Sequence, residues 1–305
     1  MGRDINLTVK LGGLELKNPV MVASGTFGYG EEYSWLVDLN QLGAVVVKGL
    51  SLKPKLGNLP PRLVETPCGL INAIGLENIG VKRFVEEKLP FLKQFDTKVI
   101  VNIFGYSVGE YAQLAEFLSS ASIDALEINI SCPNIKESGR LFGTDPKMAQ
   151  EVTKAVCQHT HLPVFVKLTP MVTDITGIVE AVMEAGADGV SLINTIPAMA
   201  VNIYTRRPRL GNVTGGMSGP CLKPIALKLI WDIVQKMRVP IIGIGGITNY
   251  EDALEFLIVG ARAVQIGTAN FVNPKTSIEI IEGIQQYLKK QGLKDINEVI
   301  GTLRI

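Results

Sequence analysis

The chain has 305 residues, of which 47% are hydrophobic and 19% charged, and it contains 31 glycines. This composition is typical of a globular enzyme and excludes a disordered or fibrous chain. The 30 lysines and arginines against 29 aspartates and glutamates leave a formal net charge of +1, so we expect neither nucleic acid nor an anionic membrane as a partner.

The N-terminal segment, residues 1–19, alternates apolar and polar side chains and predicts a β-hairpin. It lacks the basic region followed by an apolar core that marks a secretion signal. No apolar run approaches the roughly 18 residues that a membrane-spanning helix requires. The four cysteines form no CxxC pair and the two histidines lie on one short segment, so we expect a reduced, cytoplasmic protein without a metal site of its own.

Short apolar runs rich in valine and isoleucine recur along the chain and predict parallel strands that are buried on both faces. They occupy residues 19–24, 44–50, 98–105, 125–131, 163–170, 189–195, 240–247 and 263–269. Amphipathic segments between them predict helices at residues 108–120, 174–186 and 249–260.

Eight strands that alternate with helices predict an α/β protein, a (β/α)8 TIM barrel that forms one domain over residues 1–305. An open doubly wound sheet is the alternative. The connections after the second, fourth and sixth strands, residues 51–97, 132–162 and 196–238, are too long for simple loops. Long segments at one end of a barrel usually build the walls and cover of a site.

Each predicted strand ends in a small, amide-bearing or cationic residue, at the end where barrel enzymes carry their chemistry. These residues are Ser24–Gly25, Lys48–Gly49, Asn102, Asn129, Lys167, Asn194–Thr195, Gly245–Gly246 and Gly267–Thr268. A lysine in an apolar run is costly to bury without a partner, although one such lysine could extend into solvent. Two lysines at equivalent strand ends, Lys48 and Lys167, therefore indicate a functional role.

The motifs Gly245–Gly246 and Gly267–Thr268 close the seventh and eighth strands, where barrels often bind a phosphate through backbone N–H groups. Glycine also serves any tight turn, so either motif by itself would be weak. Their pairing favours a phosphate site. The segment IGIGGI lacks the spacing of a GxGxxG fingerprint, so a dinucleotide-binding fold is not predicted.

The segment NISCPN places Cys132 just after the fourth strand, between Asn129 and Asn134. A free cysteine usually packs as a small hydrophobic residue. No histidine is positioned by the sequence to activate this thiol for acyl transfer, but a thiol accepts a proton where nearby charge favours the thiolate. The segment GLINAIGLEN, residues 69–78, adds Asn72 in a glycine-rich stretch that suits a loop over a small polar ring.

Taken together, these motifs resemble class 1 dihydroorotate dehydrogenase. The resemblance rests on NISCPN, NAIGLEN, VVVKGLS, INT and TRRPRLGNVTGGMSGP, which follow in order with the glycine motifs over about residues 5–300. It implies a (β/α)8 barrel that carries FMN and oxidises dihydroorotate to orotate in pyrimidine synthesis. Residues 201–220 look most like the NAD-linked subclass. That likeness implies a homodimer that pairs, as a heterotetramer, with an electron-transfer subunit carrying FAD and a 2Fe–2S cluster.

The resemblance also implies roles for individual residues. Cys132 would remove the proton from C5 of dihydroorotate, Lys48 would bridge substrate and flavin, and Lys167 would stabilise negative charge on the reduced flavin. The substrate would be held by Lys48, Asn72, Ala73, Ile74, Gly75, Leu76, Asn129, Asn134, Asn194 and Thr195. FMN would lie against Ser24, Lys48, Gly49, Asn102, Asn129, Lys167, Ile193 and Gly219, with its phosphate on Gly245, Gly246, Gly267 and Thr268.

Other functions use some of the same residues. A barrel lyase or aldolase would form a Schiff base through Lys167 with a phosphorylated substrate. A related flavoenzyme would reduce uracil or RNA uridine, and an inactive barrel would serve as an assembly subunit. Within the resembling family, a homodimer that passes electrons to fumarate is the alternative to NAD linkage.

Overall fold

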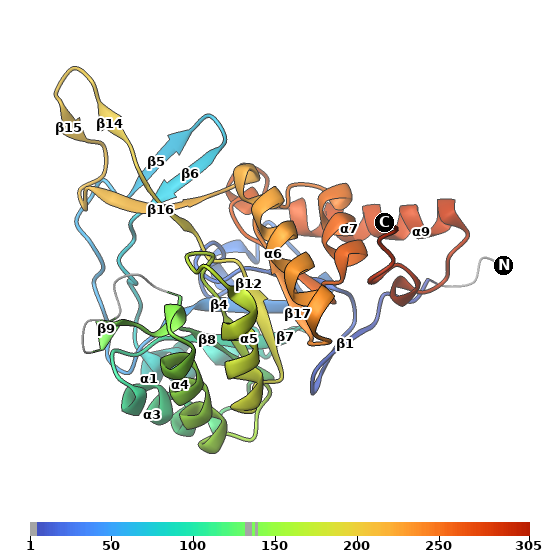
Figure 1. Ribbon diagram of the computed structural model, residues 1–305, viewed down its shortest axis with the longest axis horizontal. Helices are drawn as coiled ribbons and strands as arrows, with labels where there is room; N and C mark the ends of the chain where they lie inside the picture. Colours follow the sequence, from blue (N-terminus) through green and yellow to red (C-terminus); the bar gives the residue numbers. More distant parts are fainter. Residues whose placement is uncertain (1–4, 132–135, 138–139) are drawn as a thin grey trace.

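The computed structural model describes residues 5–131, 136–137 and 140–305, and its centre is a closed barrel of parallel strands (Figure 1). The barrel strands are β3 (Val20–Val22), β4 (Ala44–Leu50), β7 (Lys98–Ile103), β8 (Ala125–Asn129), β11 (Val164–Lys167), β12 (Gly189–Leu192), β17 (Ile241–Ile244) and β18 (Ala263–Ile266). They follow one another around the barrel in chain order, and β18 pairs with β3 to close it. The predicted barrel is confirmed, and the open sheet is excluded.

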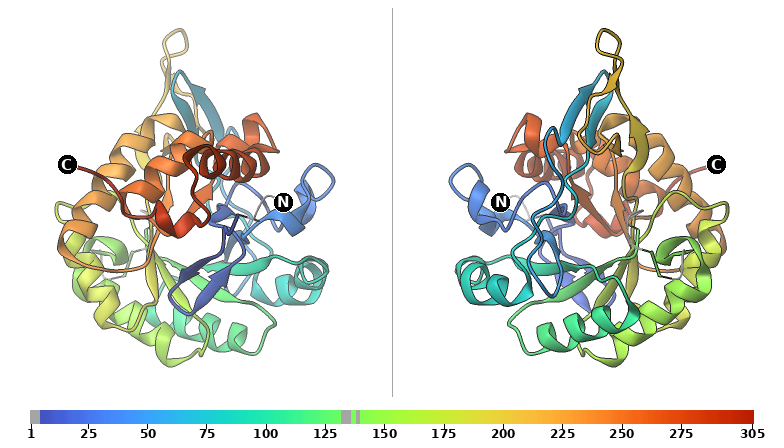
Figure 2. Two further views of the ribbon diagram at one scale, coloured as in Figure 1. Left: turned by 90° about the vertical axis from the view of Figure 1, so that its right-hand side faces the viewer. Right: turned by 90° about the vertical axis from the view of Figure 1, so that its left-hand side faces the viewer.

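Helices surround the barrel on its outer side (Figure 2). The longer ones are α3 (Val108–Ser119), α4 (Pro146–Gln158), α5 (Ile175–Glu184), α6 (Lys223–Lys236), α7 (Tyr250–Val259) and α9 (Thr276–Gln291). Several begin at a side chain that accepts a hydrogen bond from a free backbone N–H of the first turn, as Ser107, Asp174 and Asn249 do. These caps confirm the three helices that the sequence predicts, within a residue or two at each end.

Shorter helices complete the outer layer. They are α1 (Val81–Arg83), a π-helical turn (Phe84–Lys88), α2 (Leu89–Leu92) and α8 (Ala269–Val272), with 3-10 turns at Glu31–Tyr33, Leu39–Gln41, Phe142–Thr144, Pro220–Leu222 and Ile296–Glu298. No helix within the described part of the chain is both long enough and apolar enough to span a membrane.

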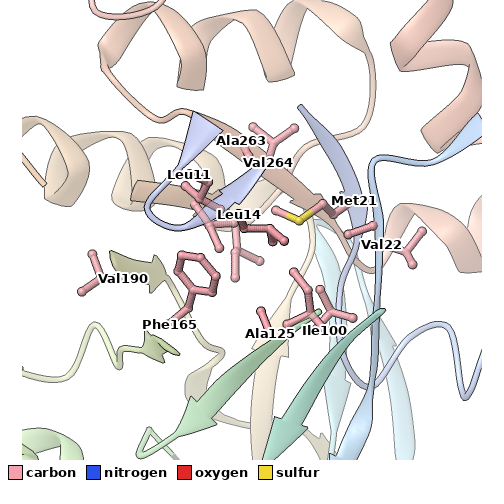
Figure 3. Close-up of a cluster of buried hydrophobic side chains, with 14 of the residues drawn as sticks. Leu11, Leu14, Met21, Val22, Ile100, Ala125, Phe165, Val190, Ala263 and Val264 are labelled. Atoms are coloured by element: carbon pink, nitrogen blue, oxygen red, sulfur yellow. The ribbon is translucent and has the colours of Figure 1, made fainter. Parts of the chain in front are cut away.

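A hairpin of β1 (Val9–Leu11) and β2 (Leu14–Leu16) closes the end of the barrel where the strands begin. Its turn packs beside Asp188 and Pro163, which directly precede β12 and β11. Figure 3 shows Leu11 and Leu14 against apolar side chains of the barrel strands. The predicted N-terminal hairpin is confirmed, and its apolar face seals this end of the core because alternate residues of each strand point to the same side.

The long connections after β4 and β12 meet in one antiparallel sheet at the opposite end of the barrel. Its strands lie in the order β13 (Ile196–Met199), β16 (Thr214–Ser218), β6 (Gly69–Asn72) and β5 (Leu63–Thr66). A smaller hairpin, β14 (Val201–Asn202) with β15 (Arg207–Pro208), extends beyond it (Figure 1). The connection after β8 contains a short pair, β9 (Lys136–Glu137) with β10 (Arg140–Leu141).

Candidate active site

The side chains that face the barrel interior change from apolar to polar within two residues along its strands. On five strands an apolar residue or glycine is followed, two positions later, by a polar residue on the same strand face. These pairs are Ile100 and Asn102, Ala125 and Glu127, Phe165 and Lys167, Gly189 and Ser191, and Ala263 and Gln265. The apolar members lie toward the hairpin end, and the polar members lie toward the end where the strands finish.

The polar members converge on one carboxylate, Glu127, which is fully buried. Its Oε1 atom accepts a hydrogen bond of 2.6 Å from Asn102 Nδ2. Its Oε2 atom accepts bonds of 2.8 Å from Ser191 Oγ and from Gln265 Nε2. The Lys167 ammonium lies 3.7 Å from Oε1 and donates a 3.2 Å hydrogen bond to Ser24 Oγ. Because the donors come from strands on opposite sides of the barrel, this network spans its interior.

Glu127 is held in its charged form despite its burial. Burial alone would raise the pKa of the Glu127 carboxyl, but the charge of Lys167 and the hydrogen bonds from Gln265, Ser191 and Asn102 outweigh it and hold that pKa below its usual value. The Lys167 side chain is only 6% exposed. The barrel mouth therefore contains a buried ion pair rather than two neutral groups.

A second group of hydrogen bonds joins the ends of β8 and β12. Asn129 Oδ1 accepts bonds from Ser131, at 2.8 Å from Oγ and 3.2 Å from the backbone N–H. Asn194 Nδ2 donates a 2.6 Å bond to the same Ser131 Oγ, and Asn194 Oδ1 accepts a 2.7 Å bond from the Thr195 N–H. The structure thus brings the predicted residues Asn129, Asn194 and Thr195 together through Ser131.

Asn72 reaches this group from the sheet above the barrel. Its Nδ2 donates a 3.1 Å bond to the carbonyl of Gly216, which is paired with Asn72 in the β6–β16 ladder. A Cβ on Gly216 would lie 2.1 Å from Thr195 Oγ1, so only glycine allows this approach. Asn72 and Thr195 therefore flank one glycine, although they belong to different connections.

The rest of the predicted substrate loop, Ala73 to Leu76, is held by residues of its own connection. The Ala73 N–H donates to the Arg62 carbonyl, and the carbonyls of Ala73 and Ile74 accept bonds from Asn58. Gly75 and Leu76 both have positive φ angles, 77° and 59°. This turn follows Asn72 in the chain, and the hydrogen bonds of its described atoms go to its own connection rather than to the Glu127 network.

The predicted phosphate residues lie together after β17 and β18 and form the glycine cluster Gly245, Gly246, Gly267 and Thr268. Gly245 and Gly246 have φ angles of 128° and 71°, a region that favours glycine. A Cβ on Gly246 would lie 2.7 Å from the Lys223 nitrogen and 2.9 Å from the carbonyl oxygens of Gly219 and Pro220. Thr268 Oγ1 donates a 2.8 Å bond to Ser218 Oγ. Gly246 therefore packs against the residues that begin α6, and the N-terminus of a helix favours a phosphate.

Three further predicted residues border these groups. A Cβ on Gly49 would lie 2.8 Å from Asn102 Oδ1, so the end of β4 packs directly against the Glu127 network. Ile193 is buried, and its side chain lies within 4 Å of the ideal Cβ position on Gly245. The end of β12 is thus in contact with the glycine cluster. Lys48 is half-buried at the same rim, and its backbone N–H donates to the Gly28 carbonyl. Cys132 and Asn134 lie outside the described residues.

Sequence reasoning missed Glu127, Ser191 and Gln265. Each interrupts an apolar run at an even spacing from a residue that was identified, such as Glu127 before Asn129 and Gln265 before Gly267. That alternation was the available signal, because residues two apart on a strand share a face. The runs were instead interpreted as continuous and buried.

Comparison with known proteins agrees with this arrangement. The family model described as dihydroorotate dehydrogenase matches residues 6–288. A protein of Desulforamulus reducens named dihydroorotate dehydrogenase B (NAD(+)), catalytic subunit, is 56% identical over 302 residues, which cover 99% of each chain. A protein of the same name from Thermodesulfovibrio yellowstonii is 55% identical over 299 residues, 98% of this chain and 99% of its own. With the barrel, the buried ion pair and the ordered motifs, these matches show that the chain belongs to the dihydroorotate dehydrogenase family.

Proposed function

We propose that this chain oxidises dihydroorotate to orotate with bound FMN, as the catalytic subunit of an NAD-linked dihydroorotate dehydrogenase in pyrimidine synthesis. One observation carries the proposal. Three groups lie together at the ends of the barrel strands: the buried Lys167–Glu127 pair, the asparagines joined through Ser131, and the glycine cluster. A phosphate-bearing cofactor beside a small polar substrate needs such an arrangement. The relatives support the proposal, because each is named as the catalytic subunit of dihydroorotate dehydrogenase B (NAD(+)).

The residues present fit FMN. The glycine cluster Gly245, Gly246, Gly267 and Thr268 offers backbone and hydroxyl groups for a phosphate beside the first residue of α6. The remaining FMN contacts are assigned to groups at the neighbouring strand ends, Ser24, Lys48, Gly49, Asn102, Asn129, Lys167, Ile193 and Gly219. When bound, FMN supplies the two-electron acceptor for the hydrogen at C6 of the substrate.

The substrate side is assigned to the asparagine group and the loop beside it. Each asparagine side chain offers both a donor and an acceptor, which suits the N–H and carbonyl edges of a dihydropyrimidine. The assigned residues are Lys48, Asn72, Ala73, Ile74, Gly75, Leu76, Asn129, Asn134, Asn194 and Thr195. Their mutual hydrogen bonds through Ser131 and Gly216 fix the amide groups before a substrate arrives, and fixed donors favour orientation over induced rearrangement.

Proton removal is assigned to Cys132, which would take the proton from C5 of dihydroorotate. The thiolate is the form that accepts a proton, and positive charge at the barrel mouth favours it. Lys167 supplies such charge, because its ammonium is buried at the strand ends and fixed by Ser24 and Glu127. A fixed cation also stabilises negative charge that develops as the substrate is oxidised.

The electron route and the assembly are likewise part of the proposal. Relatives are named as catalytic subunits of NAD(+)-linked enzymes, and this name supports the existence of a partner subunit. We assign FAD and a 2Fe–2S cluster to that partner. We assign this chain a homodimer within a heterotetramer. The β13–β15 region exposes Met199, Val201, Ile203 and Tyr204, and an apolar patch of this kind favours a protein interface. A cytoplasmic location stays a prediction from the sequence.

A Schiff-base lyase is less consistent with the geometry. Attack by a lysine requires its neutral amine. The contact of Lys167 with Glu127, together with the donation to Ser24, favours the charged ammonium. Trapping with borohydride in the presence of phosphorylated aldehydes and ketones should therefore leave Lys167 unmodified.

The proposed function is tested by anaerobic titration of the purified, flavin-loaded chain. Addition of (S)-dihydroorotate should bleach the flavin absorbance and yield one orotate per flavin. Dihydrouracil, which lacks the carboxylate, is the matched control and should bleach it far more slowly. Equal reaction with dihydrouracil, or a chain that binds no FMN, would contradict the proposal.

The electron acceptor is tested separately by multiple turnover. The isolated chain should produce no NADH, and addition of the iron-bearing partner subunit should start NADH formation. Rapid turnover of the isolated chain with fumarate would favour the homodimeric, fumarate-linked alternative.

A further inference from the structure

One buried ionisable group at the barrel mouth, Glu127, is assigned no contact with substrate or cofactor in the proposed reaction. Glu127 has no exposed surface, and it lies beneath the strand-end residues rather than among those assigned to substrate. Both of its oxygens are engaged, and the groups that face it come from β7, β11, β12 and β18 and from Ser24, just after β3. A carboxylate that four strands converge on is expensive to bury, so it needs an explanation beyond packing.

Among the described residues that face this carboxylate, Lys167 carries the opposing charge. Asn102, Ser191 and Gln265 donate neutral hydrogen bonds, and Ser24 Oγ donates a longer one, 3.5 Å, to Oε1 while accepting from Lys167. Lys167 is therefore held from two directions, by the Ser24 hydroxyl and by the charge of Glu127. An ammonium that is 6% exposed would be costly to keep charged without such a partner.

We propose that Glu127 is a positioning residue for the flavin chemistry: it is the fixed counter-ion that keeps Lys167 protonated and in place in both redox states of the bound cofactor. This inference rests on the proposed function, because it concerns a flavin at this barrel mouth. Glu127 acts through Lys167 and is assigned no contact with substrate or cofactor.

The consequence is a difference in how many protons accompany reduction. With Glu127 present, Lys167 already holds its proton, so two electrons enter with the one proton that flavin itself takes up. Without Glu127, Lys167 would release its proton while the isoalloxazine ring of the cofactor is oxidised and uncharged, and it would regain the proton when reduction places negative charge on that ring. Two electrons then enter with two protons, one on the flavin and one on Lys167.

The experiment is a measurement of the flavin midpoint potential between pH 7 and 9 in wild type and in Glu127→Gln, which keeps the side-chain shape. For a two-electron couple each proton taken up contributes a tenfold change per pH unit, about 30 mV. We expect the wild-type slope to be near that for one proton and the Glu127→Gln slope to approach twice that value. Ser191→Ala is the matched control, because it removes one hydrogen bond to Glu127 and leaves the charge; its slope should follow wild type.

A shorter carboxylate provides the second variant if Glu127→Gln does not fold. Glu127→Asp keeps the charge but draws it back from Lys167 by one methylene, so its slope should lie between those of wild type and Glu127→Gln. If the midpoint potential of both Glu127 variants changed with pH at the wild-type slope, the inference would be overturned, whether or not the potentials themselves were shifted. An equal steepening in Ser191→Ala would also overturn it, because hydrogen bonding rather than charge would then be responsible. A wild-type chain without bound flavin would instead contradict the proposed function.

Discussion

At the hairpin end of the barrel, Leu11 and Leu14 lie in one cluster with fully buried side chains such as Phe165 and Met21 (Figure 3). Two residues further along the strands, the interior is instead occupied by Glu127 and its hydrogen-bond donors. The apolar end is stabilised by removal of hydrocarbon from water and by close packing. The polar end gains little net stability from its buried ion pair, since desolvation offsets most of the attraction. The same strands therefore supply stability at one end and a charged, preorganised site at the other.

The largest effect is expected at the polar end, from Cys132→Ser. Loss of a general base typically lowers the rate by about 10²–10⁴-fold, so dihydroorotate oxidation should fall by that factor at neutral pH while FMN remains bound. Stopped-flow flavin reduction measures this. Cys157→Ser is the matched control, because burial raises the pKa of the Cys157 thiol to about 11 and its helix lies on the outside of the barrel. Reduction at the wild-type rate by Cys132→Ser would refute the assigned base.

At the apolar end, Phe165→Ala should lower the free energy of unfolding by about 3–5 kcal/mol, because it leaves a cavity in a fully packed core. The rate of flavin reduction per folded molecule should stay near that of wild type, since Phe165 lies one step below the Lys167 layer. Urea unfolding and stopped-flow reduction together test the division between the two ends. A large fall in the rate with little loss of stability would break the comparison.

A third prediction concerns the ion pair of Lys223, the residue whose backbone nitrogen packs against Gly246. Lys223 Nζ lies 2.7 Å from Asp252 Oδ1, and Asp252 also accepts hydrogen bonds from Thr248. Burial acts to raise the pKa of Asp252, but the bonds from Lys223 and Thr248 outweigh it and lower that pKa. A folded pKa below the unfolded value adds stability above the unfolded pKa, about 3.9, and that stability is lost as the pH falls through the folded value.

Asp252→Asn should therefore destabilise the protein by about 1.5–3 kcal/mol at pH 7, and the difference from wild type should shrink below about pH 4. Urea unfolding at a series of pH values measures it. The control is Asp232→Asn in the exposed Lys228–Asp232 pair, where about 0–1 kcal/mol is expected. A difference for Asp252→Asn that does not change with pH would show that packing, not charge, is responsible.

The smallest effect on stability is expected from Gly246→Ala, which tests whether the glycine cluster binds the FMN phosphate. The positive φ of Gly246 costs an alanine about 1–2 kcal/mol. Gly292→Ala is the matched control, because its φ is 70° against 71° for Gly246 but nothing lies within 4 Å of its Cβ position. Both variants should lose stability from backbone strain, and Gly246→Ala should lose more because its Cβ would also meet backbone atoms at 2.7–2.9 Å. Gly246→Ala alone should release FMN, as measured by flavin fluorescence after dilution. Equal FMN retention would place the phosphate elsewhere.

Much of this fold could be predicted from the sequence because its strands are buried on both faces. Runs such as residues 44–50 and 263–269 are apolar enough to identify the strand without any knowledge of its neighbours. Apart from β4, which spans its whole run, the observed strands are shorter than the runs, and β18 ends at Ile266 because the last residues of its run already belong to the mouth. Glycine and asparagine at those positions also marked the end of the barrel that holds the site.

Two features depended on contacts between distant parts of the chain. The sheet above the barrel joins Asn72 to Gly216, which are 144 positions apart, and nothing local in either connection specifies that pairing. Glu127 meets Gln265 across the barrel, 138 positions away. The sequence by itself determined which segments become strands and which ends carry polar groups, since burial and periodicity are properties of each segment. Only the closed barrel decided which polar groups meet, because closure brings strands from opposite sides within hydrogen-bonding distance.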